Sequence, residues 1–487
     1  MKMLKNIKLH AKIPAFIIAV LFSLILFIWY RIDPTKIMAD NFKLYIHGMD
    51  GAPVSAEDSV LTGDFASYGQ RYTGSAISTP GSWSGFRGND SDNVYKESIP
   101  LLDTWNEQDP EIIWTVELGE GHAAPAVSEG KVYVLDYDEQ RKSDSLRIFS
   151  LNSGQEIFRR WYLSPMKRNH GFSRTVPAVS ENYAVSIGPT CQVMTVNTES
   201  GDFIWHIDMV SKYGTKVPFW YTGQCPLLDN ETVILAPAGN VLLTGIDLAS
   251  GDTIWETPNE NNWSMSHSSV MPMTLNNKKM YVYAAIGGVA GISAAGNDRG
   301  KILWQTSDWS HSVIAPSPVI FPDGRIFLTA GYGGGSMMIQ VYYEQESFNV
   351  KTLFNYDPKG GMACEQQTPI LYRDHLFGIL PKDAGTLRNQ FICYNPNEGV
   401  TGKIVWSSGK TNQFGLGPYI LADGKFYILS DDGVLTIIKA SVESYQELDE
   451  QKVLPGPDAW GPIAIVNGFM LLRDTKKMIC LDMRKKE

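Results

Sequence analysis

The sequence Ser-Gly-Asp-Phe-Ile-Trp at residues 200–205 returns as Ser-Gly-Asp-Thr-Ile-Trp at residues 250–255. Two further copies, at 299–304 and 401–406, keep the glycine and the tryptophan, and a weaker copy at 153–158 ends in phenylalanine. The conserved pairs of the four strong copies are Gly201 and Trp205, Gly251 and Trp255, Gly300 and Trp304, and Gly402 and Trp406. Each copy is a polar turn followed by an apolar strand, which is typical of a β-hairpin. The spacing of 47 to 50 residues between the first four copies indicates a repeat architecture.

The units between these turns contain short apolar runs that alternate with polar residues, as strands of a half-buried sheet do. Each unit opens on a strand that carries a proline, and eight such strands occur. Their prolines are Pro125, Pro177, Pro226, Pro272, Pro318, Pro369, Pro418 and Pro462, of which Pro272 stands in a divergent context. Four strands per repeat of this length predict the blades of a β-propeller. We therefore predict an all-β fold with eight four-stranded blades.

The last unit ends near residues 480–482, before a fourth strand. A strand of the missing type, Glu-Ile-Ile-Trp-Thr-Val, stands at residues 111–116 with no blade before it. We predict that this strand pairs with the C-terminal strands and closes the ring, because closure removes two exposed sheet edges.

The N-terminus contains an uncharged run at residues 13–30, preceded by four lysines and followed by Arg31. This length is at the lower limit for a membrane-spanning helix, and the lysines favour a cytoplasmic N-terminus. The residues after the run do not resemble a cleavage site, so an uncleaved anchor is preferred over a cleaved signal peptide. The predicted organisation is a cytoplasmic segment 1–12, a transmembrane anchor 13–30, a linker 31–82 and a propeller 83–487. The propeller would lie on the extracytoplasmic or periplasmic side of the inner (plasma) membrane.

The charge and the cysteines exclude several classes of function. The chain carries 42 Lys and Arg against 52 Asp and Glu, a formal net charge of −10. This acidic balance argues against nucleic acid as a partner. The five cysteines form no CxxC or haem motif. The glycine-rich stretch 331–336 precedes a strand instead of a helix, which favours a hairpin turn over a phosphate site. The acidic pairs Asp136/Asp138 and Asp431/Asp432 are expected in solvated turns.

The phrase Asp-Leu-Ala-Ser-Gly-Asp-Thr-Ile-Trp at residues 247–255 resembles the tryptophan-docking motif of the PQQ-like β-propeller repeat family. The lead-in Trp-Ser-Gly-Phe-Arg-Gly-Asn at 83–89 is similar to that of many bacterial members. The resemblance implies eight blades, with each tryptophan packed between neighbouring blades. The family includes dehydrogenases that use pyrroloquinoline quinone (PQQ) with calcium, and non-catalytic scaffolds, among them the lipoprotein propeller of outer-membrane-protein assembly. The adjacent cysteine pair of the dehydrogenases is absent here, and no calcium or catalytic set can be matched.

The loops that lead into the inner strands surround one mouth of a propeller channel, so their side chains are the candidate binding residues. These are His122, Arg174, Trp220, Gln224, Trp263, His267, Trp309, His311, Glu365 and Trp460. Aromatic rings with convergent polar groups are typical of a binding site. The alternative is a structural plug whose polar groups satisfy one another, including a cross-channel ion pair between Arg174 and Glu365. A metal site among the histidines has no supporting ligand spacing.

These observations predict a membrane-anchored, non-catalytic scaffold that binds an envelope protein through its face or rim. The first alternative is binding of a small molecule or carbohydrate at the Trp/His-lined mouth. The second is a PQQ-dependent dehydrogenase, and only that alternative requires a cofactor, namely PQQ with calcium.

Overall fold

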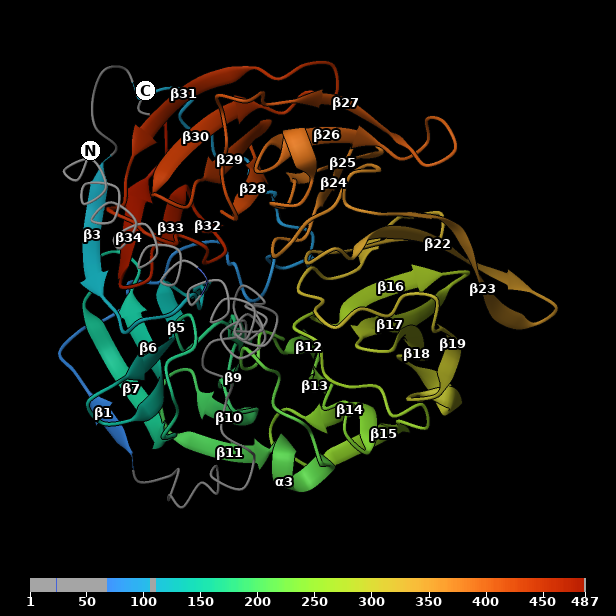
Figure 1. Cartoon of the computed structure of the whole chain (residues 1–487). Helices are drawn as coiled ribbons and strands as arrows, with labels where there is room; N and C mark the ends of the chain where they lie inside the picture. The colour runs from blue at the N-terminus through green and yellow to red at the C-terminus, as the bar shows by residue number, and fades with distance from the viewer. Residues whose placement is uncertain (1–22, 24–67, 106–110, 486–487) are drawn as a thin grey trace, which may run out of the picture. The chain divides into compact units, whose positions relative to one another are not determined.

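The computed structural model describes Ser23 and residues 68–105 and 111–485. The chain divides into two units, Met1–Ala52 and Pro53–Glu487, and the strands of the described residues belong to the second. In that unit, the eight sheets of the described residues are arranged in a ring around a central axis, as the blades of a propeller (Figure 1). The predicted eight-bladed, four-stranded architecture is confirmed.

The first four blades follow one another along the chain, each running from its inner to its outer strand. Blade 1 is β4 (Ala126–Ser128), β5 (Lys131–Asp138), β6 (Ser143–Ser150) and β7 (Glu156–Leu163); blade 2 is β8 (Ala178–Val179), β9 (Tyr183–Ile187), β10 (Gln192–Asn197) and β11 (Phe203–Asp208); blade 3 is β12 (Leu227–Asp229), β13 (Thr232–Leu235), β14 (Val241–Asp247) and β15 (Thr253–Pro258); blade 4 is β16 (Met271–Leu275), β17 (Lys278–Ala285), β18 (Gly288–Ser293) and β19 (Ile302–Thr306).

The second half of the ring repeats this order. Blade 5 is β20 (Val319–Ile320), β21 (Arg325–Ala330), β22 (Gly335–Glu344) and β23 (Ser347–Tyr356); blade 6 is β24 (Ile370–Tyr372), β25 (His375–Ile379), β26 (Phe391–Asn395) and β27 (Lys403–Ser407); blade 7 is β28 (Tyr419–Ala422), β29 (Lys425–Leu429), β30 (Val434–Lys439) and β31 (Glu447–Lys452); blade 8 is β32 (Ala464–Val466), β33 (Phe469–Arg473), β34 (Lys477–Asp482) and β3 (Ile112–Glu117). Within residues 68–105 and 111–485, three short helical turns connect strands: α3 (Met209–Tyr213), η2 (Gly296–Asp298) and η3 (Gly385–Leu387).

The ring closes through β3, as the sequence predicts. This strand pairs antiparallel with β34, with Trp114 opposite Cys480 and Thr115 opposite Ile479. Blade 8 therefore takes three strands from the C-terminal end of the described chain and one from the N-terminal part (Figure 1). Pairing the two segments satisfies the backbone groups that each would otherwise expose.

The tryptophans of the repeat pack between neighbouring blades, as the family resemblance implies. Trp205 of blade 2 covers Gly251 at the next blade's turn, where an added Cβ would lie 2.7 Å from the indole. Gly251 has a φ of 79°, a conformation that favours glycine. The Trp205 indole N–H donates to the Leu248 carbonyl of that turn at 2.9 Å. Trp255 covers Gly300 in the same way.

The segment before the first blade crosses the propeller from blade 1 to blade 7. Strand β1 (Gly69–Arg71) lies along the outer edge of β7, within the range predicted as a linker. Trp83 then bridges to Val127 of the inner strand β4. Finally, β2 (Val94–Tyr95) pairs in parallel with the inner strand β28. The lead-in motif therefore packs against inner strands and helps to fill the channel.

The predicted anchor at residues 13–30 lies outside the described residues, apart from Ser23. Across the part of the chain that the structure describes, no helix has both the length and the apolar character needed to span a bilayer.

Candidate functional site

The loops that lead into the inner strands gather at one end of the channel, here called the mouth. The turns between the second and third strands of each blade lie at this same end, because adjacent strands are antiparallel. The mouth is therefore built from two sets of loops, of which the sequence analysis considered only the first.

An aromatic cluster crosses the mouth from blade 3 to blade 5. Trp220, in the loop before β12, stacks on Tyr332 in the β21–β22 turn, with ring centroids 5.5 Å apart and an interplanar angle of 22°. The ring of His267, from blade 4, lies 6.1 Å from Trp220. Glu365 packs against Gly331 of the β21–β22 turn. Tyr332 is 43% exposed, so this cluster presents an aromatic surface to solvent.

Arg174 ties the mouth loops of blades 2 and 3 together. Its guanidinium donates to the backbone carbonyls of Trp220 at 2.6 Å, His170 at 3.0 Å and Asn169 at 2.5 Å. No ion pair joins it to Glu365 among the described residues, so the cross-channel pair considered above does not form. Burial lowers the pKa of Arg174 to about 10. Burial, and then the charge of Arg174, lowers the pKa of His267 to about 4, so this ring is neutral at neutral pH.

Two other buried arginines bind backbone carbonyls in the same manner. Arg473, at the end of β33, donates to the carbonyls of Ala123 at 2.8 Å and Thr475 at 3.0 Å. Arg87, in the lead-in motif, donates to Thr368 at 2.9 Å and Pro369 at 3.1 Å. Burial lowers the pKa of each to about 10. Both guanidinium groups bond backbone carbonyls that lie outside the regular strands. These bonds fix the mouth loops and the lead-in motif in place.

The candidate residues of blades 1 and 8 meet at the opposite side of the mouth. The ring of His122 stacks on Trp460 with centroids 4.9 Å apart. The Trp460 indole N–H donates to Asp431 at 2.8 Å, and its backbone carbonyl accepts from Gln367 at 3.0 Å. Asp431, expected in a solvated turn, is thus half-buried and hydrogen-bonded within the mouth.

The remaining four predicted residues lie away from the exposed mouth or at its margin. Gln224 is fully buried and exchanges two hydrogen bonds with the backbone of Ala236. Trp263 packs in the core between blades 3 and 4, and Trp309 packs in the core between blades 4 and 5. His311 is half-buried and meets the edge of Trp309 at 4.3 Å. These side chains support the loops that carry the exposed residues.

A cleft of about 520 Å³ opens beside His122, over the junction of blades 8 and 1. Four segments form its wall: the loop after β3, the loop before β8, the loop before β32 and the β33–β34 turn. The lining residues are Glu117, Glu120, His122, Arg168, His170, Pro455, Gly456, Pro457, Asp458, Asp474, Thr475, Lys476 and Lys477. Its volume lies within the range usual for small-ligand sites, and its wall is strongly polar.

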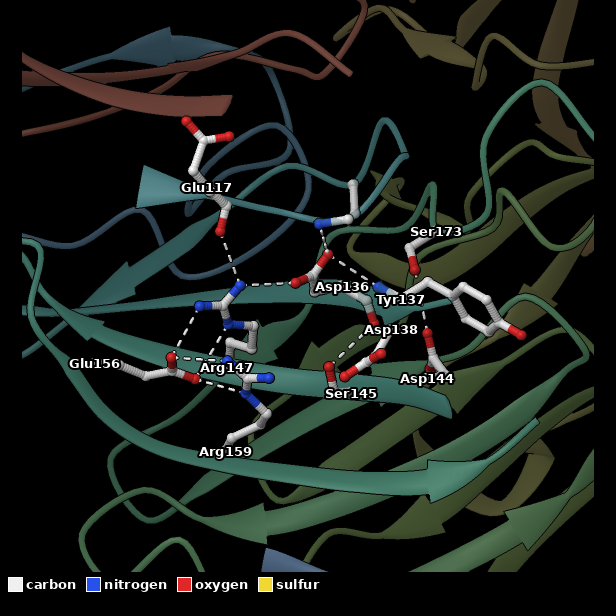
Figure 2. Close-up of polar contacts among 12 residues, drawn as sticks. Glu117, Asp136, Tyr137, Asp138, Asp144, Ser145, Arg147, Glu156, Arg159 and Ser173 are labelled. Atoms are coloured by element: carbon white, nitrogen blue, oxygen red, sulfur yellow. Dashed lines mark hydrogen bonds and ion pairs between the residues drawn. The ribbon is translucent and has the colours of Figure 1, made fainter. Parts of the chain in front are cut away.

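A network of acids and arginines in blade 1 contacts Glu117, which lines this cleft (Figure 2). Arg147 forms ion pairs with Asp136 and Glu156, both at 2.8 Å, and donates to the Glu117 backbone carbonyl at 3.0 Å. The prediction that Asp136 lies in a solvated turn is wrong. Strand β5 continues to Asp138, which places Asp136 inside the sheet at 6% exposure.

Asp144 is the most enclosed acid of this region. It accepts hydrogen bonds from Tyr162 at 2.7 Å and Ser173 at 3.1 Å (Figure 2), and it is fully buried. No cation pairs with it in the described structure. Burial raises its pKa to about 7.

The donor groups of the described residues do not fit a calcium-held quinone. The five cysteines are separate, free and buried. Within residues 68–105 and 111–485, no three His, Cys, Asp or Glu side chains come together as metal ligands. We therefore derive no chemical step through such a group.

A family model matches residues 142–400, which is more than half of the chain, and its description reads "Outer membrane protein assembly factor BamB". The chain belongs to this BamB family. The match covers blades 2 to 5 completely, together with parts of blades 1 and 6. It confirms the resemblance to PQQ-like repeats, and no curated protein sequence matches the chain.

Solved structures of low sequence identity with a TM-score of at least 0.50 share this fold. Quinohemoprotein alcohol dehydrogenase ADHIIG from Pseudomonas putida HK5 has a TM-score of 0.53 at 11% identity, covering 84% of this chain and 81% of the dehydrogenase. The computationally designed Ika8 protein has a TM-score of 0.50 at 12% identity, covering 77% of this chain and all of the designed protein. BamB from Moraxella catarrhalis has a TM-score of 0.49 at 11% identity, with 77% and 100% coverage. At these identities the likeness concerns the fold, which hosts both enzymes and non-enzymes.

The structure adds residues to the mouth that the sequence analysis did not select. Tyr332, Asp431 and Asp474 come from turns between second and third strands. The repeat pattern could have identified these residues, because the turns between second and third strands must lie at the same end as the loops into the inner strands. Asp458, two positions before Trp460 in the same loop, also lines the cleft, although it is not among the predicted site residues.

Proposed function

We propose that this BamB-family chain is a membrane-anchored, extracytoplasmic and non-catalytic scaffold that binds a protein of the cell envelope. The anchor is the predicted span 13–30, and the family name supports a role in outer-membrane assembly. The observation that carries the binding role is the Trp220–Tyr332 stack at the mouth. Partly exposed aromatic rings held on rigid loops supply large contact area at low entropic cost, and they are enriched at protein interfaces.

The loops beneath these rings are already fixed in the free protein. Arg174 binds the Trp220 carbonyl, so the loop that carries this ring is held by a charge-assisted hydrogen bond. A preformed aromatic surface loses little conformational freedom when a partner docks. We therefore assign docking to the mouth in preference to the outer rim of the propeller.

Site-specific crosslinking in intact cells tests this proposal. A photo-reactive residue replaces Tyr332 at the mouth, and a matched variant carries it at Val400, which is 90% exposed in the β26–β27 turn. We expect a specific envelope polypeptide to be captured from position 332 and not from position 400. Capture from position 400 alone would overturn docking at the mouth. Absence of capture at both positions, with both proteins folded and membrane-bound, would overturn the scaffold role.

A further inference from the structure

The cleft over blades 8 and 1 contains a buried imidazole with one unused nitrogen. His122 is 9% exposed and lines the cleft. Its Nε2 lies 3.0 Å from the carbonyl oxygen of His170. A carbonyl only accepts hydrogen bonds, so Nε2 carries the hydrogen and donates it. Nδ1 then carries a lone pair, and no hydrogen-bond donor reaches it in the described structure.

The His122 ring is neutral at physiological pH. Burial, followed by the charges of Arg174 and Arg473, holds its pKa well below the ordinary value, although the nearby backbone of His170 and Asp458 acts in the other direction. A neutral ring with Nε2–H presents a hydrogen-bond acceptor at Nδ1. A buried acceptor without a donor is costly, and a bound N–H group would satisfy it.

Asp458 supplies a second acceptor on the wall of the same cleft. Its carboxylate forms no hydrogen bond or ion pair within the described part of the chain. The neighbouring carboxylate of Asp431 is occupied by the Trp460 indole N–H and the Leu416 backbone N–H. Burial and the charge of Asp431 raise the pKa of Asp458, whereas His170, Lys382 and Arg168 lower it without forming an ion pair with it in the described structure. An added positive charge at this carboxylate is therefore favoured.

Two cations of the cleft wall are already committed to other acids. Arg168 binds Glu120 through its Nε at 2.7 and 2.9 Å. The Lys477 ammonium lies 3.5 Å from Glu117. The third, Lys476, is exposed on the β33–β34 turn. Neither Arg168 nor Lys477 therefore serves as the partner of Asp458 or of His122 Nδ1.

We propose that this cleft binds an organic ammonium group, whose N–H donors bond His122 Nδ1 and the Asp458 carboxylate. The stacked ring of Trp460 lies behind His122 and holds the imidazole in place. The same chemistry occurs in a lysine side chain of a bound polypeptide and in a free polyamine. The cleft, at about 520 Å³, has room for the alkyl chain of either. This site is separate from the Trp220–Tyr332 surface and does not depend on the proposed scaffold role.

Calorimetric titration of the full-length protein in a non-ionic detergent tests the site. The probes are N-acetyl-lysine methylamide, its neutral form acetylated at the side-chain nitrogen, and spermidine. We expect at least one of the two amines to bind at concentrations below about 10 mM and the neutral probe not to bind. Asp458→Asn should weaken amine binding by about tenfold or more, because it removes the negative charge and keeps the size.

Two further variants separate this site from a general charge effect. His122→Phe keeps the stack on Trp460 and removes the acceptor, so it should also weaken binding by about tenfold. Asp252→Asn, at an exposed turn of blade 3, should leave binding unchanged. Tighter binding of the lysine amide would identify a polypeptide side chain as the ligand, and tighter binding of spermidine would identify a free amine.

Three results would overturn the inference: equal binding of the neutral probe, unchanged affinity in Asp458→Asn, or no binding of either amine by the folded wild-type protein. Each of these is compatible with crosslinking from position 332, so failure of the ammonium site and failure of the scaffold role are distinguishable.

Discussion

Arg147 of blade 1 donates a hydrogen bond to the backbone carbonyl of Glu117, at the end of the strand that closes blade 8, at a distance of 3.0 Å. The same nitrogen pairs with Asp136 at 2.8 Å. The ring is thus closed twice, by the β3–β34 ladder and by a guanidinium that joins blade 1 to β3 (Figure 2). Because Glu117 also lines the cleft, this contact couples ring closure to the geometry of the proposed ammonium site.

Removal of the Arg147 charge should destabilise the ring. Arg147→Met leaves Asp136 buried without its cation, whereas Glu156 keeps its ion pair with Arg159. Loss of one partner from a buried pair costs about 3–5 kcal/mol. The measurement is chemical denaturation, combined with hydrogen exchange of the β3 amides, which should lose protection first. Arg141→Met is the matched control, because its pair with Asp138 is exposed and contributes at most about 1 kcal/mol. Equal effects of the two substitutions would contradict a role of Arg147 in closure.

The tryptophan of each repeat should contribute through packing more than through its hydrogen bond. Trp205→Ala removes an indole that is 7% exposed and should cost about 3–5 kcal/mol. Trp205→Phe keeps a ring over Gly251 and loses the bond to Leu248, so it should cost less than the alanine variant. Blade 1 already has a phenylalanine, Phe158, at the equivalent position, and its ring covers Gly201. Unfolding curves of the two variants give the comparison, and a phenylalanine variant as unstable as the alanine variant would contradict it.

The repeat predicted the blade count and the closing strand, because each depends on local pattern and period. The interblade position of the tryptophans was implied by the family resemblance. The repeat could not predict the Arg147–Asp136 pair, since Asp136 was expected in a solvated turn and lies inside β5 instead. The selection of mouth residues was limited for a related reason. Position in a loop does not determine side-chain direction, and Trp263 turns into the core while Tyr332, on another turn, is exposed.

The attachment of the lead-in segment, residues 68–105, to the propeller should depend on Arg87. This side chain is 6% exposed and binds carbonyls of both its own segment and the residues preceding β24. Arg87→Met leaves those carbonyls without their donor, and hydrogen bonds to a charged group contribute about 1.5–3 kcal/mol each. We expect a large fall in stability and faster proteolysis of residues 68–105.

Lys96→Met is the control for the Arg87 variant, since Lys96 belongs to the same segment and forms exposed ion pairs with Asp90 and Asp92. Its loss should change stability by less than about 1 kcal/mol. Similar proteolysis rates in the two variants would show that Arg87 does not hold the lead-in segment on the propeller.

Asp144 should make stability fall with rising pH. Its folded-state pKa is about 7, against 3.8 ordinarily, because burial disfavours the carboxylate more than Tyr162 and Ser173 stabilise it. Between about pH 4 and pH 7 the unfolded chain releases this proton while the folded chain retains it, so the free energy of unfolding decreases as pH rises. A shift of this size corresponds to about 4 kcal/mol across that interval.

Asp144→Asn isolates this contribution from all other titrating groups. The amide is neutral at every pH and can bond both hydroxyls, because each hydroxyl can donate or accept. The free energy of unfolding of the wild type, minus that of the variant, should therefore fall between about pH 4 and pH 7 and remain level above pH 8. The two pH series are measured by chemical denaturation in parallel. A difference that is flat from pH 4 to pH 7, or that increases, would show that the buried carboxyl is ionised throughout and is stabilised by its two hydroxyl donors.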